Sequence, residues 1–374
     1  MLTQDQELVA DTARRFSREV LLPGAAAREA ARTIEPDVIR GLAEIGLLGV
    51  TVSTDYDGAG ADYVSYALAL MAIAEGDGAV STMMSVHNAP FCAILERYGS
   101  EEQKQQVLKP AARGEFIGAF ALTESHAGSD ASAIRTRAVR KEGGYLINGS
   151  KQFITSGHIA RYAVVFAVTD PENPKRGITA FLVPTGSPGY SVTKTEHKLG
   201  QKASDTCSLA LDDLFVPEST RIGAEGDGYR IALSSLEAGR IGIASQSVGM
   251  AQAALGHAIH YAREREAFGK PLIEHQAVSF RLADAKTRVE AARQLVLSAA
   301  RMKDAGVACL EQACMAKLFA SEAAEAVCST AIQTFGGYGY VEDFPVERIY
   351  RDARVCQIYE GTSDIQRIII GRGL

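Results

Sequence analysis

Residues 358–366, Ile-Tyr-Glu-Gly-Thr-Ser-Asp-Ile-Gln, place an acidic side chain, Glu360, beside a glycine that lets the chain turn sharply. Ser363 and Gln366 have the spacing of a capping box, which predicts that the last helix begins here. A carboxylate in this position can serve as a general base, or it can only face the positive end of the helix dipole. On this segment alone the structural interpretation is favoured.

Residues 121–130, Ala-Leu-Thr-Glu-Ser-His-Ala-Gly-Ser-Asp, are rich in small side chains and hydroxyls. Such a loop lets the backbone approach a flat or phosphorylated ligand closely. Taken alone, it is more simply interpreted as a capped, glycine-containing loop.

Two further segments combine cations or glycines with aromatic side chains. Residues 263–272 place Arg265 and Phe268 just before a Gly-Lys-Pro turn. Arginine suits a pyrophosphate, although cations at a helix end also complement its dipole, and both interpretations stay open. Residues 333–340, Gln-Thr-Phe-Gly-Gly-Tyr-Gly-Tyr, predict a sharp turn or a closely approaching ligand. The G-x-G-x-x-G order is missing and no strand precedes these glycines, so they are not a Rossmann fingerprint.

Composition and charge exclude several classes of function. The six cysteines include no C-x-x-C pair and lie mostly in apolar stretches, which predicts buried free thiols in a reducing compartment. The seven histidines lack metal-ligand spacing, so no metal site is expected. The net charge of −6 gives no general attraction to nucleic acid or to an anionic membrane. Without a stretch of membrane-spanning length or a signal peptide, the protein is expected to be cytoplasmic, or a mitochondrial matrix protein whose presequence was removed.

The 374 residues are too many for one compact core, and their texture changes twice along the chain. Residues 1–115 are Ala- and Leu-rich with helical spacing, in which Leu42, Ile45 and Leu48 line one helix face. Breaks are expected at residues 23–24 and 57–60, where Pro and Gly cluster.

Residues 116–225 are predicted to form short strands, because residues 162–168 and 178–183 are apolar runs rich in β-branched side chains. Asn148-Gly149 between two apolar runs predicts a hairpin turn. In residues 226–374 the stretches 243–264, 278–305 and 310–335 are long amphipathic helices that need one another to bury their apolar stripes. The predicted fold is therefore α+β and multidomain: an N-terminal α-helical domain (1–115), a middle β-barrel or sandwich (116–225) and a C-terminal four-helix bundle (226–374).

Together, in this order and at these separations, the four segments resemble the acyl-CoA dehydrogenase family over essentially the whole chain. Both family signatures are present, one at residues 121–133 and one as Gln333-x-x-Gly336-Gly337-x-Gly339-Tyr340-x-x-Asp343. Residues 239–246, Gly-Arg-Ile-Gly-Ile-Ala-Ser-Gln, resemble the short-chain, butyryl-type members. The resemblance implies FAD-dependent dehydrogenation of a short-chain acyl-CoA, straight or branched, to the trans-2-enoyl-CoA. It also implies a place in fatty acid β-oxidation or branched-chain amino acid degradation.

The resemblance assigns Glu360 as the catalytic base that removes the α-proton of the substrate while flavin N5 accepts the β-hydrogen as hydride. The Glu360 backbone N–H and a ribityl hydroxyl of FAD would polarise the thioester carbonyl as an enolate develops. An apolar cleft should raise the pKa of Glu360 toward the working pH. Reduced FAD would then pass its electrons to an electron-transfer flavoprotein.

The other site residues follow from the same resemblance, position by position. FAD is expected to contact Phe120, Leu122, Thr123, Ser129, Phe153, Ile154, Thr155, Thr362, Ser363 and Asp364. A neighbouring subunit is expected to hold the pyrophosphate and adenine half through Arg265, Phe268, Gln276, Gln333, Gly336 and Gly337. The minimum unit is then a homodimer, and the usual state a homotetramer built as a dimer of dimers. The substrate is expected near Ser129, Glu237, Arg240, Tyr359 and Gly361, with Met83 and Met84 either shortening the pocket or filling the core.

Three departures from the family pattern bear on the site. Ser125-His126 stands where relatives often have Pro-Gly, and a loop variant is favoured over a catalytic imidazole. Phe153 replaces the usual flavin-stacking Trp in a chain that contains no Trp. Gly239 stands where some relatives carry the base, and because glycine cannot serve there, the assignment of Glu360 is strengthened.

Three alternatives use the same fold. A flavin monooxygenase is disfavoured because such relatives usually lack the glutamate. An acyl-CoA oxidase stays open, because access of oxygen depends on the shape of the cavity. A non-catalytic, flavin-bound assembly protein is disfavoured by the complete signatures.

Overall fold

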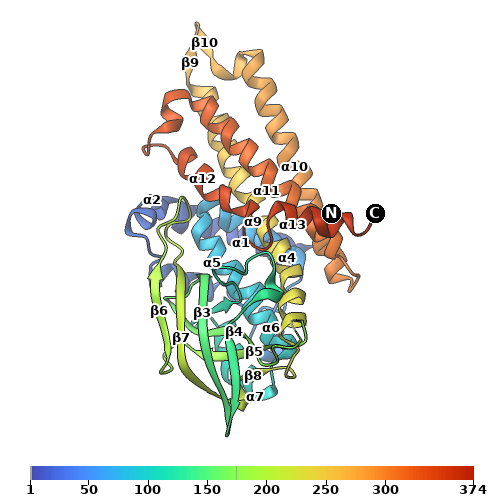
Figure 1. Cartoon of the computed structure of the whole chain (residues 1–374). Helices are drawn as coiled ribbons and strands as arrows, with labels where there is room; N and C mark the ends of the chain where they lie inside the picture. The colour runs from blue at the N-terminus through green and yellow to red at the C-terminus, as the bar shows by residue number, and fades with distance from the viewer. Residues whose placement is uncertain (1, 174) are drawn as a thin grey trace.

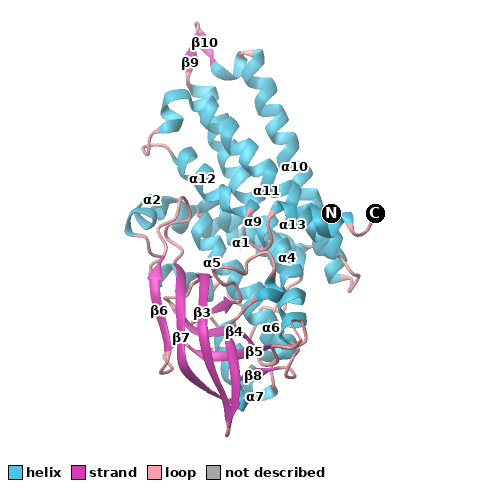
Figure 2. Cartoon of the chain, viewed as in Figure 1, coloured by secondary structure: helices cyan, strands magenta, loops and turns pink. Residues whose placement is uncertain are grey.

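The computed structural model describes residues 2–173 and 175–374 of the chain. Strands gather at one end of the molecule, and three long helices extend from the other (Figure 1). Shorter helices lie between the two ends and beside the sheet (Figure 2). This helical, β, helical arrangement is the one predicted from the sequence.

The N-terminal region is built from short helices. In chain order these are α1 (Gln4–Phe16), α2 (Leu22–Ala31), α3 (Pro36–Glu44), α4 (Tyr63–Gly76), α5 (Gly78–Val86), α6 (Ala93–Tyr98), α7 (Glu101–Gln103) and α8 (Lys109–Ala112). Turns of π-helix, η1 (Ser17–Leu21), η3 (His87–Cys92) and η4 (Lys104–Leu108), connect several of them, and η2 (Thr54–Tyr56) is a 3-10 turn.

Two local predictions in this region are wrong. The chain stays helical past Pro23-Gly24, because the π turn η1 changes the hydrogen-bond register and Pro23 falls in the first turn of α2, where its missing N–H costs little. The face expected through Leu42, Ile45 and Leu48 is interrupted, since α3 ends at Glu44 and Gly46 adopts a left-handed φ of 75°. Leu42 and Leu48 are both buried nonetheless.

Helix α4 joins the N-terminal helices to those of the C-terminal region. Twelve of its 14 residues are buried, and it is apolar on every side, as a helix surrounded by protein must be. Its N-terminus receives the Asp304 carboxylate, which accepts from the Tyr63 N–H at 2.7 Å and from the Val64 N–H at 3.2 Å. The first and last thirds of the chain therefore share one core.

The middle region forms a mixed sheet of eight strands. Its members are β1 (Ile117–Ala121), β2 (Arg137–Lys141), β3 (Gly144–Thr155), β4 (Ala160–Val168), β5 (Ile178–Pro184), β6 (Tyr190–Thr195), β7 (Thr206–Pro217) and β8 (Arg221–Ile222). The path runs β6-β7-β3-β2-β4-β5-β8, and β1 pairs in parallel with β4. One buried cluster is made of strand residues alone, from β1 to β5 and β7, so the sheet closes over itself as a barrel or sandwich does.

The predicted hairpin at Asn148-Gly149 is wrong. Strand β3 runs straight through these residues, and the turn lies instead at residues 142–143, where Gly143 has a φ of 77°. Gly149 marks a β-bulge against β7, and its backbone approaches Thr136 so closely that a Cβ there would lie 2.5 Å from Oγ1. Glycine at this position therefore serves close packing.

The C-terminal region contains the three long helices predicted from the sequence. They are α9 (Gly228–Glu264), α10 (Gln276–Asp304) and α11 (Leu310–Phe335), followed by the short α12 (Pro345–Ala353) and α13 (Ser363–Gly371). The short strands β9 (Glu266–Ala267) and β10 (Lys270–Pro271) form a hairpin at the far tip (Figure 1). The long helices pack on one another, and α12, α13 and α4 complete the bundle in place of a fourth long helix.

All six cysteines are buried, as their apolar surroundings predict, and none is in a disulfide within the described residues. Across residues 2–173 and 175–374, no three His, Cys, Asp or Glu side chains gather as a metal site would require. No helix of the described chain has the length and apolarity needed to cross a membrane.

Candidate active site

Glu360 lies on a strained turn between η9 (Arg354–Gln357) and α13. Its φ is 55°, and Gly361 follows at 89°, so two consecutive residues are left-handed. This conformation is costly for a residue with a side chain, and it persists only where the surroundings impose it. Gln366 donates from Nε2 to the carbonyls of Glu360 and Gly361, at 3.2 and 2.8 Å.

The helix begins at Ser363 as predicted, but the predicted capping box is wrong. The N-cap is Thr362, whose Oγ1 accepts from the Ile365 N–H at 3.4 Å. Gln366 turns back to the carbonyls of the Glu360 turn, and the Ser363 hydroxyl is buried without a partner among the described residues. The side chain at 366 thus stabilises the turn instead of capping the helix.

The Glu360 carboxylate is buried on one side and opens to a cavity on the other. Its Oε2 has no hydrogen-bond partner in the described chain. Loss of solvent raises the pKa of Glu360 to about 7, against the opposing effect of two cations, Arg240 and Lys317. A carboxyl with a pKa near neutrality exchanges protons readily at physiological pH, which is the property a general base needs.

The space for this carboxylate comes from a glycine on α9. A Cβ at Gly239 would lie 2.7 Å from Glu360 Oε2 and 2.9 Å from its Cδ. Glycine inside a helix is unfavourable by about 1 kcal/mol relative to alanine. Here its lack of a side chain leaves room for the acid.

Tyr359, the neighbour of Glu360, is anchored in a buried polar network. Its hydroxyl hydrogen-bonds Gln246 Oε1 and accepts from Gln201 Nε2 at 3.3 Å. Gln246 in turn donates to the Gly78 carbonyl at 2.8 Å and to Ser81 Oγ at 2.7 Å. Side chains from α5, α9 and the loop before β7 therefore hold the residue that precedes Glu360.

A cavity of about 630 Å³ opens in front of Glu360, between the sheet, α9 and α13. The predicted site residues that line it are Phe120, Leu122, Thr123, Ser129, Phe153, Ile154, Thr155, Arg240, Tyr359, Glu360 and Gly361. They come from widely separated parts of the sequence, and the fold brings them together around one cavity. This set includes the predicted base, Glu360, and most of the residues expected beside the flavin.

Phe153 presents its ring to this cavity because the backbone of β3 is distorted. The register of β3 against β7 shifts between Lys151 and Ile154, and Phe153 has a φ of 58°. A bulge of this kind re-aims a side chain, and Phe153 is left 62% exposed. An aromatic residue in a strained conformation with its face uncovered fits a flat ligand stacked against it.

The loop after β1 is held against β3 by a buried ion pair. Lys151 Nζ lies 2.8 Å from Glu124 Oε1 and donates to the Leu122 carbonyl at 3.1 Å. The Glu124 carboxylate also accepts from the backbone N–H groups of Arg135 and Thr136. The hydroxyls of Thr123 and Ser129 are thereby fixed at the cavity wall, where they can bind the polar edge of a ligand.

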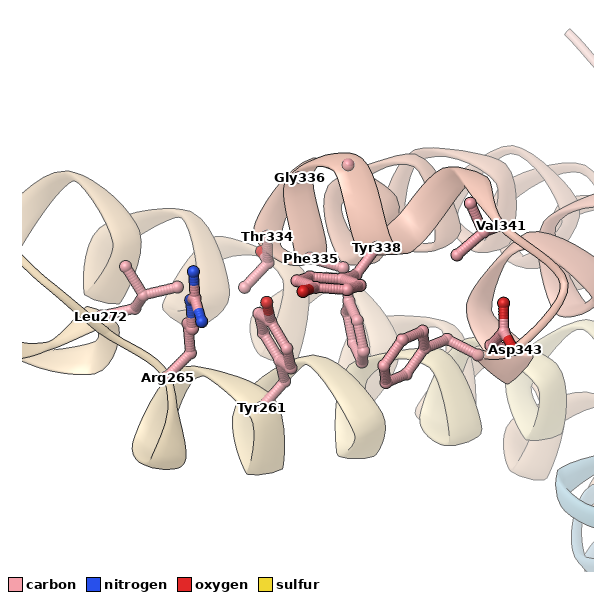
Figure 3. A pocket seen from close by; sticks show the side chains of 11 residues that line it. Tyr261, Arg265, Leu272, Thr334, Phe335, Gly336, Tyr338, Val341 and Asp343 are labelled. Atoms are coloured by element: carbon pink, nitrogen blue, oxygen red, sulfur yellow. The ribbon is translucent and has the colours of Figure 1, made fainter.

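A second cavity, of about 920 Å³, lies between the end of α9 and the end of α11. Figure 3 shows Arg265 facing the aromatic rings of Tyr261, Phe335 and Tyr338. The Tyr261 and Phe335 rings stack at 4.2 Å between centroids, and Gly336 has a φ of 62°. Arg265, Gly336 and Gly337 therefore form a cationic, glycine-lined surface, distant in the chain from Glu360.

The remaining predicted contacts do not meet the first cavity within one copy of the chain. Phe268 is 97% exposed at the tip of the β9–β10 hairpin, and Gln276 and Gln333 are also exposed. These residues were expected to act on a neighbouring subunit, which stays a prediction.

Other predicted residues lie beside the first cavity without lining it. Glu237 pairs with Lys303 at 3.0 Å, Thr362 caps α13, and Asp364 is exposed. Met83 and Met84 are buried in the core, which favours the interpretation as core filler over a pocket floor. His126 bonds the Ala133 carbonyl outside the lining, as a loop variant would.

On the α9 wall of the cavity, sequence reasoning identified Arg240 and missed its neighbours. Tyr229, Leu233, Leu236 and Ile243 line the cavity on the same helix as Arg240. Their spacing of three or four residues places them on one helical face, so the signal was present but could not be told apart from a core stripe.

The Glu360 carboxylate, with a pKa near neutrality, opens on a largely apolar cavity. The same cavity is lined by the aromatic ring of Phe153 and by the hydroxyls of Thr123 and Ser129. This site can remove a proton from a weakly acidic carbon held in a water-poor space, and it can hold a flat cofactor beside that carbon. The residues present therefore fit a flavin, and the glycines and Arg265 of the second cavity fit a diphosphate.

Family models cover nearly the whole chain. Residues 3–115 match "Acyl-CoA dehydrogenase, N-terminal domain", 119–214 match the middle domain and 226–374 match the C-terminal domain. An acyl-CoA dehydrogenase of Bacillus subtilis is 46% identical over 373 residues, covering 100% of this chain and 98% of the relative. A short-chain specific acyl-CoA dehydrogenase of Clostridium acetobutylicum is 42% identical, covering 99% of this chain and 97% of the relative.

Solved structures agree with these relatives. The butyryl-CoA dehydrogenase of Megasphaera elsdenii matches with a TM-score of 0.98 at 40% identity, over 100% of this chain and 98% of that one. A chain from a structure of the electron transferring flavoprotein of Acidaminococcus fermentans matches with a TM-score of 0.98 at 42% identity, with the same coverage. A glutaryl-CoA dehydrogenase of Mycobacterium smegmatis in complex with FADH2 has a TM-score of 0.94 at 34% identity, over 100% of this chain and 95% of that one.

Proposed function

The chain belongs to the acyl-CoA dehydrogenase family, and we propose from this premise that it oxidises a short-chain acyl-CoA to the trans-2-enoyl-CoA with Glu360 as its base. It is an FAD-dependent oxidoreductase of that family. The observation that carries the mechanism is the Glu360 carboxylate, which opens on the cavity with a pKa of about 7. A short chain is supported by the relatives, which include enzymes named as short-chain specific.

The cofactor fits the first cavity through its flavin end. Phe153 offers the ring face, while Thr123, Ser129 and Thr155 offer hydroxyls at the same wall. Bound there, FAD would supply the acceptor for the hydride that leaves the β-carbon of the substrate. The protein supplies the position, the exclusion of water and the base.

Glu360 takes the α-proton onto its carboxylate. That proton becomes acidic enough only if the thioester oxygen is polarised as negative charge develops on it. The Glu360 backbone N–H donates to no acceptor among the described residues, so it is available for this oxygen. The turn that directs the Glu360 carboxylate toward the cavity therefore also leaves the Glu360 N–H free for the thioester oxygen. One residue would thus act on both the α-proton and the carbonyl.

The apolar wall of α9 excludes water from the acyl chain. Leu233, Leu236 and Ile243 face the cavity, and a desolvated carboxylate is a stronger base than one in water. Arg240 lies on the same face, and its positive charge limits the rise of the Glu360 pKa. We expect it to keep the carboxylate partly ionised at neutral pH.

The electron acceptor we propose is an electron-transfer flavoprotein, and the working assembly a homotetramer arranged as a dimer of dimers. A neighbouring subunit would bring its Arg265, Gly336 and Gly337 to the diphosphate of the cofactor. The assembly is supported by the two cavities of one chain, which share no lining residue, so that Arg265, Gly336 and Gly337 do not meet the cavity of Glu360 within one copy.

Anaerobic mixing with acyl-CoAs tests the function. We expect straight chains of about four carbons to bleach the flavin absorbance fastest, with α-methyl-branched chains as the second arm. A maximum at long chains would contradict the short-chain proposal, and no bleaching by any acyl-CoA would favour a non-catalytic protein.

Reoxidation then identifies the electron acceptor. Rapid reoxidation by electron-transfer flavoprotein with slow reoxidation by air is expected of a dehydrogenase, and the reverse would identify an oxidase. Glu360→Gln should keep FAD and bind substrate without bleaching; near-wild-type bleaching would overturn the assigned base.

A further inference from the structure

Lys317 on α11 is a buried cation directly behind the catalytic turn. Its side chain is inaccessible to solvent, and Nζ donates to the Gly361 carbonyl at 2.7 Å. No carboxylate of the described chain lies within 4.0 Å of Nζ. Burying an ammonium without an ion pair costs several kcal/mol, so a structural role alone would be served better by an apolar side chain.

The contact of Lys317 falls on the strained part of the backbone. Glu360 and Gly361 are both left-handed, and the carbonyl of Gly361 accepts from Lys317 and from Gln366 Nε2 at once. Two donors from two different helices thus fix the orientation of this peptide group. Because Glu360 precedes it, the same contacts fix the direction of the base.

The charge of Lys317 also reaches the carboxylate. The cations that face Glu360 are Arg240 from α9 and Lys317 from α11, and each lowers the pKa of Glu360 against the effect of burial. Around Lys317 itself lie Cys356 and Glu360 from the C-terminal segment, Arg240 from α9 and Cys314 from α11. Of these neighbours, Glu360 is the carboxylate, so the ammonium and the base form a buried pair of opposite charges separated by the turn.

We propose that Lys317 is a positioning residue for the catalytic base: it locks the Glu360–Gly361 turn through the Gly361 carbonyl and supplies a fixed positive charge that keeps the carboxylate ionised. The inference rests on the proposed function, because it concerns the base of that reaction. Lys317 contacts neither substrate nor cofactor in this arrangement, since it does not line the cavity.

Lys317→Met tests the proposal by removing the charge and the donor while keeping the bulk. We expect kcat to fall about tenfold, and the acid limb of the kcat/KM profile to move up by about 0.5–1 pH unit, because the carboxylate loses a nearby opposite charge. Lys198→Met is the matched control, because Lys198 also donates to a backbone carbonyl, that of Ser204 at 2.6 Å, but does not line the cavity. It should leave both quantities unchanged.

The same limb is measured in Lys317→Gln, which removes the charge but keeps an N–H donor on a slightly shorter side chain, and which serves if the methionine variant does not fold. An acid limb that stays in place in the folded variants overturns the proposal, whether or not kcat falls, since a packing defect lowers kcat without moving the limb. Lys317→Arg, which keeps the charge and a donor, should restore the wild-type limb.

A second readout needs no turnover. Burial lowers the pKa of Lys317 to about 8, below its ordinary value near 10.5, so the folded state binds fewer protons than the unfolded state between these pH values. Wild-type stability should therefore rise relative to Lys317→Met from pH 8 to 10, followed as the difference in Tm. A constant difference would show that Lys317 keeps its ordinary pKa in the folded protein, and the acid limb of Lys317→Met then decides the proposal. If the wild type bleaches with no acyl-CoA while this slope is present, the proposed function fails and the buried cation stands.

Discussion

The Glu360 carboxylate occupies the space that a side chain at position 239 would need. A Cβ on Gly239 would come within 2.7 Å of Glu360 Oε2, although the two residues lie on different elements and far apart in sequence. The position of the Glu360 carboxylate therefore depends on the absence of a side chain at Gly239. A glycine inside a long helix is otherwise unexplained, since it weakens the helix.

Gly239→Ala should separate stability from activity. The added methyl improves helix propensity by up to about 1 kcal/mol, yet it displaces the carboxylate from the position it now fills. We expect kcat/KM for the acyl-CoA to fall at least about tenfold, because a misplacement near 1 Å costs that much or more. Thermal unfolding should show a midpoint equal to or above that of the wild type.

The control for that substitution lies on the same helix. Gly256 on α9 is exposed, and a Cβ there would meet nothing within 4 Å. Gly256→Ala should raise the midpoint of unfolding by the same propensity effect and leave kcat/KM unchanged. If the two variants lose activity equally, the loss arises from helix rigidity and the role assigned to Gly239 is wrong.

Glu360→Gln should stabilise the protein, and more so at higher pH. The pKa of the Glu360 carboxyl is about 7 in the folded protein, above its ordinary 4.5, so the acid favours folding below pH 4.5 and this contribution is lost as the pH rises through 7. An amide does not titrate, and the variant should therefore gain up to about 3 kcal/mol on the wild type between pH 5 and pH 8. Tm measured for both proteins across this pH range gives the pH dependence of their difference in stability. A difference that does not change with pH would mean that folding does not raise the pKa of the Glu360 carboxyl.

The pH dependence of turnover should report the same group. Glu360 must be ionised to accept the α-proton, so kcat/KM should rise with pH through about 7 and level off above it. Arg240→Met should move this limb upward, because Arg240 is the larger of the two cationic effects on the carboxyl. A limb near pH 4.5 in the wild type would show that water reaches the Glu360 carboxylate in the free enzyme.

The sequence indicated the layout of the chain, because the patterns that predict the long helices are local. It also predicted Glu360 as the base, which stays a prediction. The long helices follow from apolar spacing within each segment, and the Glu360 turn from one glycine and one helix start. The assignment of Glu360 needed the whole pattern of four segments, since each of them alone has an ordinary structural interpretation.

What the sequence could not show are the features created by contacts between distant segments. Asn148-Gly149 has hairpin chemistry, but pairing of β3 with β7 along its whole length turned it into a bulge. The left-handed φ of Phe153, the capping by Thr362 and the burial of Lys317 behind Gly361 depend likewise on partners elsewhere in the fold. From the sequence alone, Lys317 in its Ala-rich helix would be predicted to lie on the surface, because its partner, the Gly361 carbonyl, is distant in the chain.

The buried pair Lys151–Glu124 should be required for a stable flavin wall. Glu124→Gln leaves the Lys151 ammonium, whose pKa burial already lowers to about 8, without a counter-charge, and this should cost about 3–5 kcal/mol. The double variant Lys151→Met with Glu124→Gln should recover part of the loss, because no unpaired charge is left. Denaturant unfolding of the single and double variants measures this, and Arg40→Met, which breaks the exposed pair with Asp37, should leave the midpoint in place.

Substitutions of Phe153 separate the effect of its strained backbone on stability from the effect of its ring on FAD binding. With a φ of 58° the residue is strained, and Phe153→Gly removes the strain while Phe153→Ala retains it, so the glycine variant should be more stable than the alanine variant by about 1 kcal/mol. Both lose the ring of a residue that is 62% exposed at the cavity, and both should bind FAD at least about tenfold more weakly, because stacking on an aromatic face contributes on the order of 1–3 kcal/mol. Unfolding of the apoprotein gives the first quantity, and fluorescence titration with FAD gives the second. If FAD binds the variants as tightly as the wild type, the strain at Phe153 serves the sheet and not the cofactor.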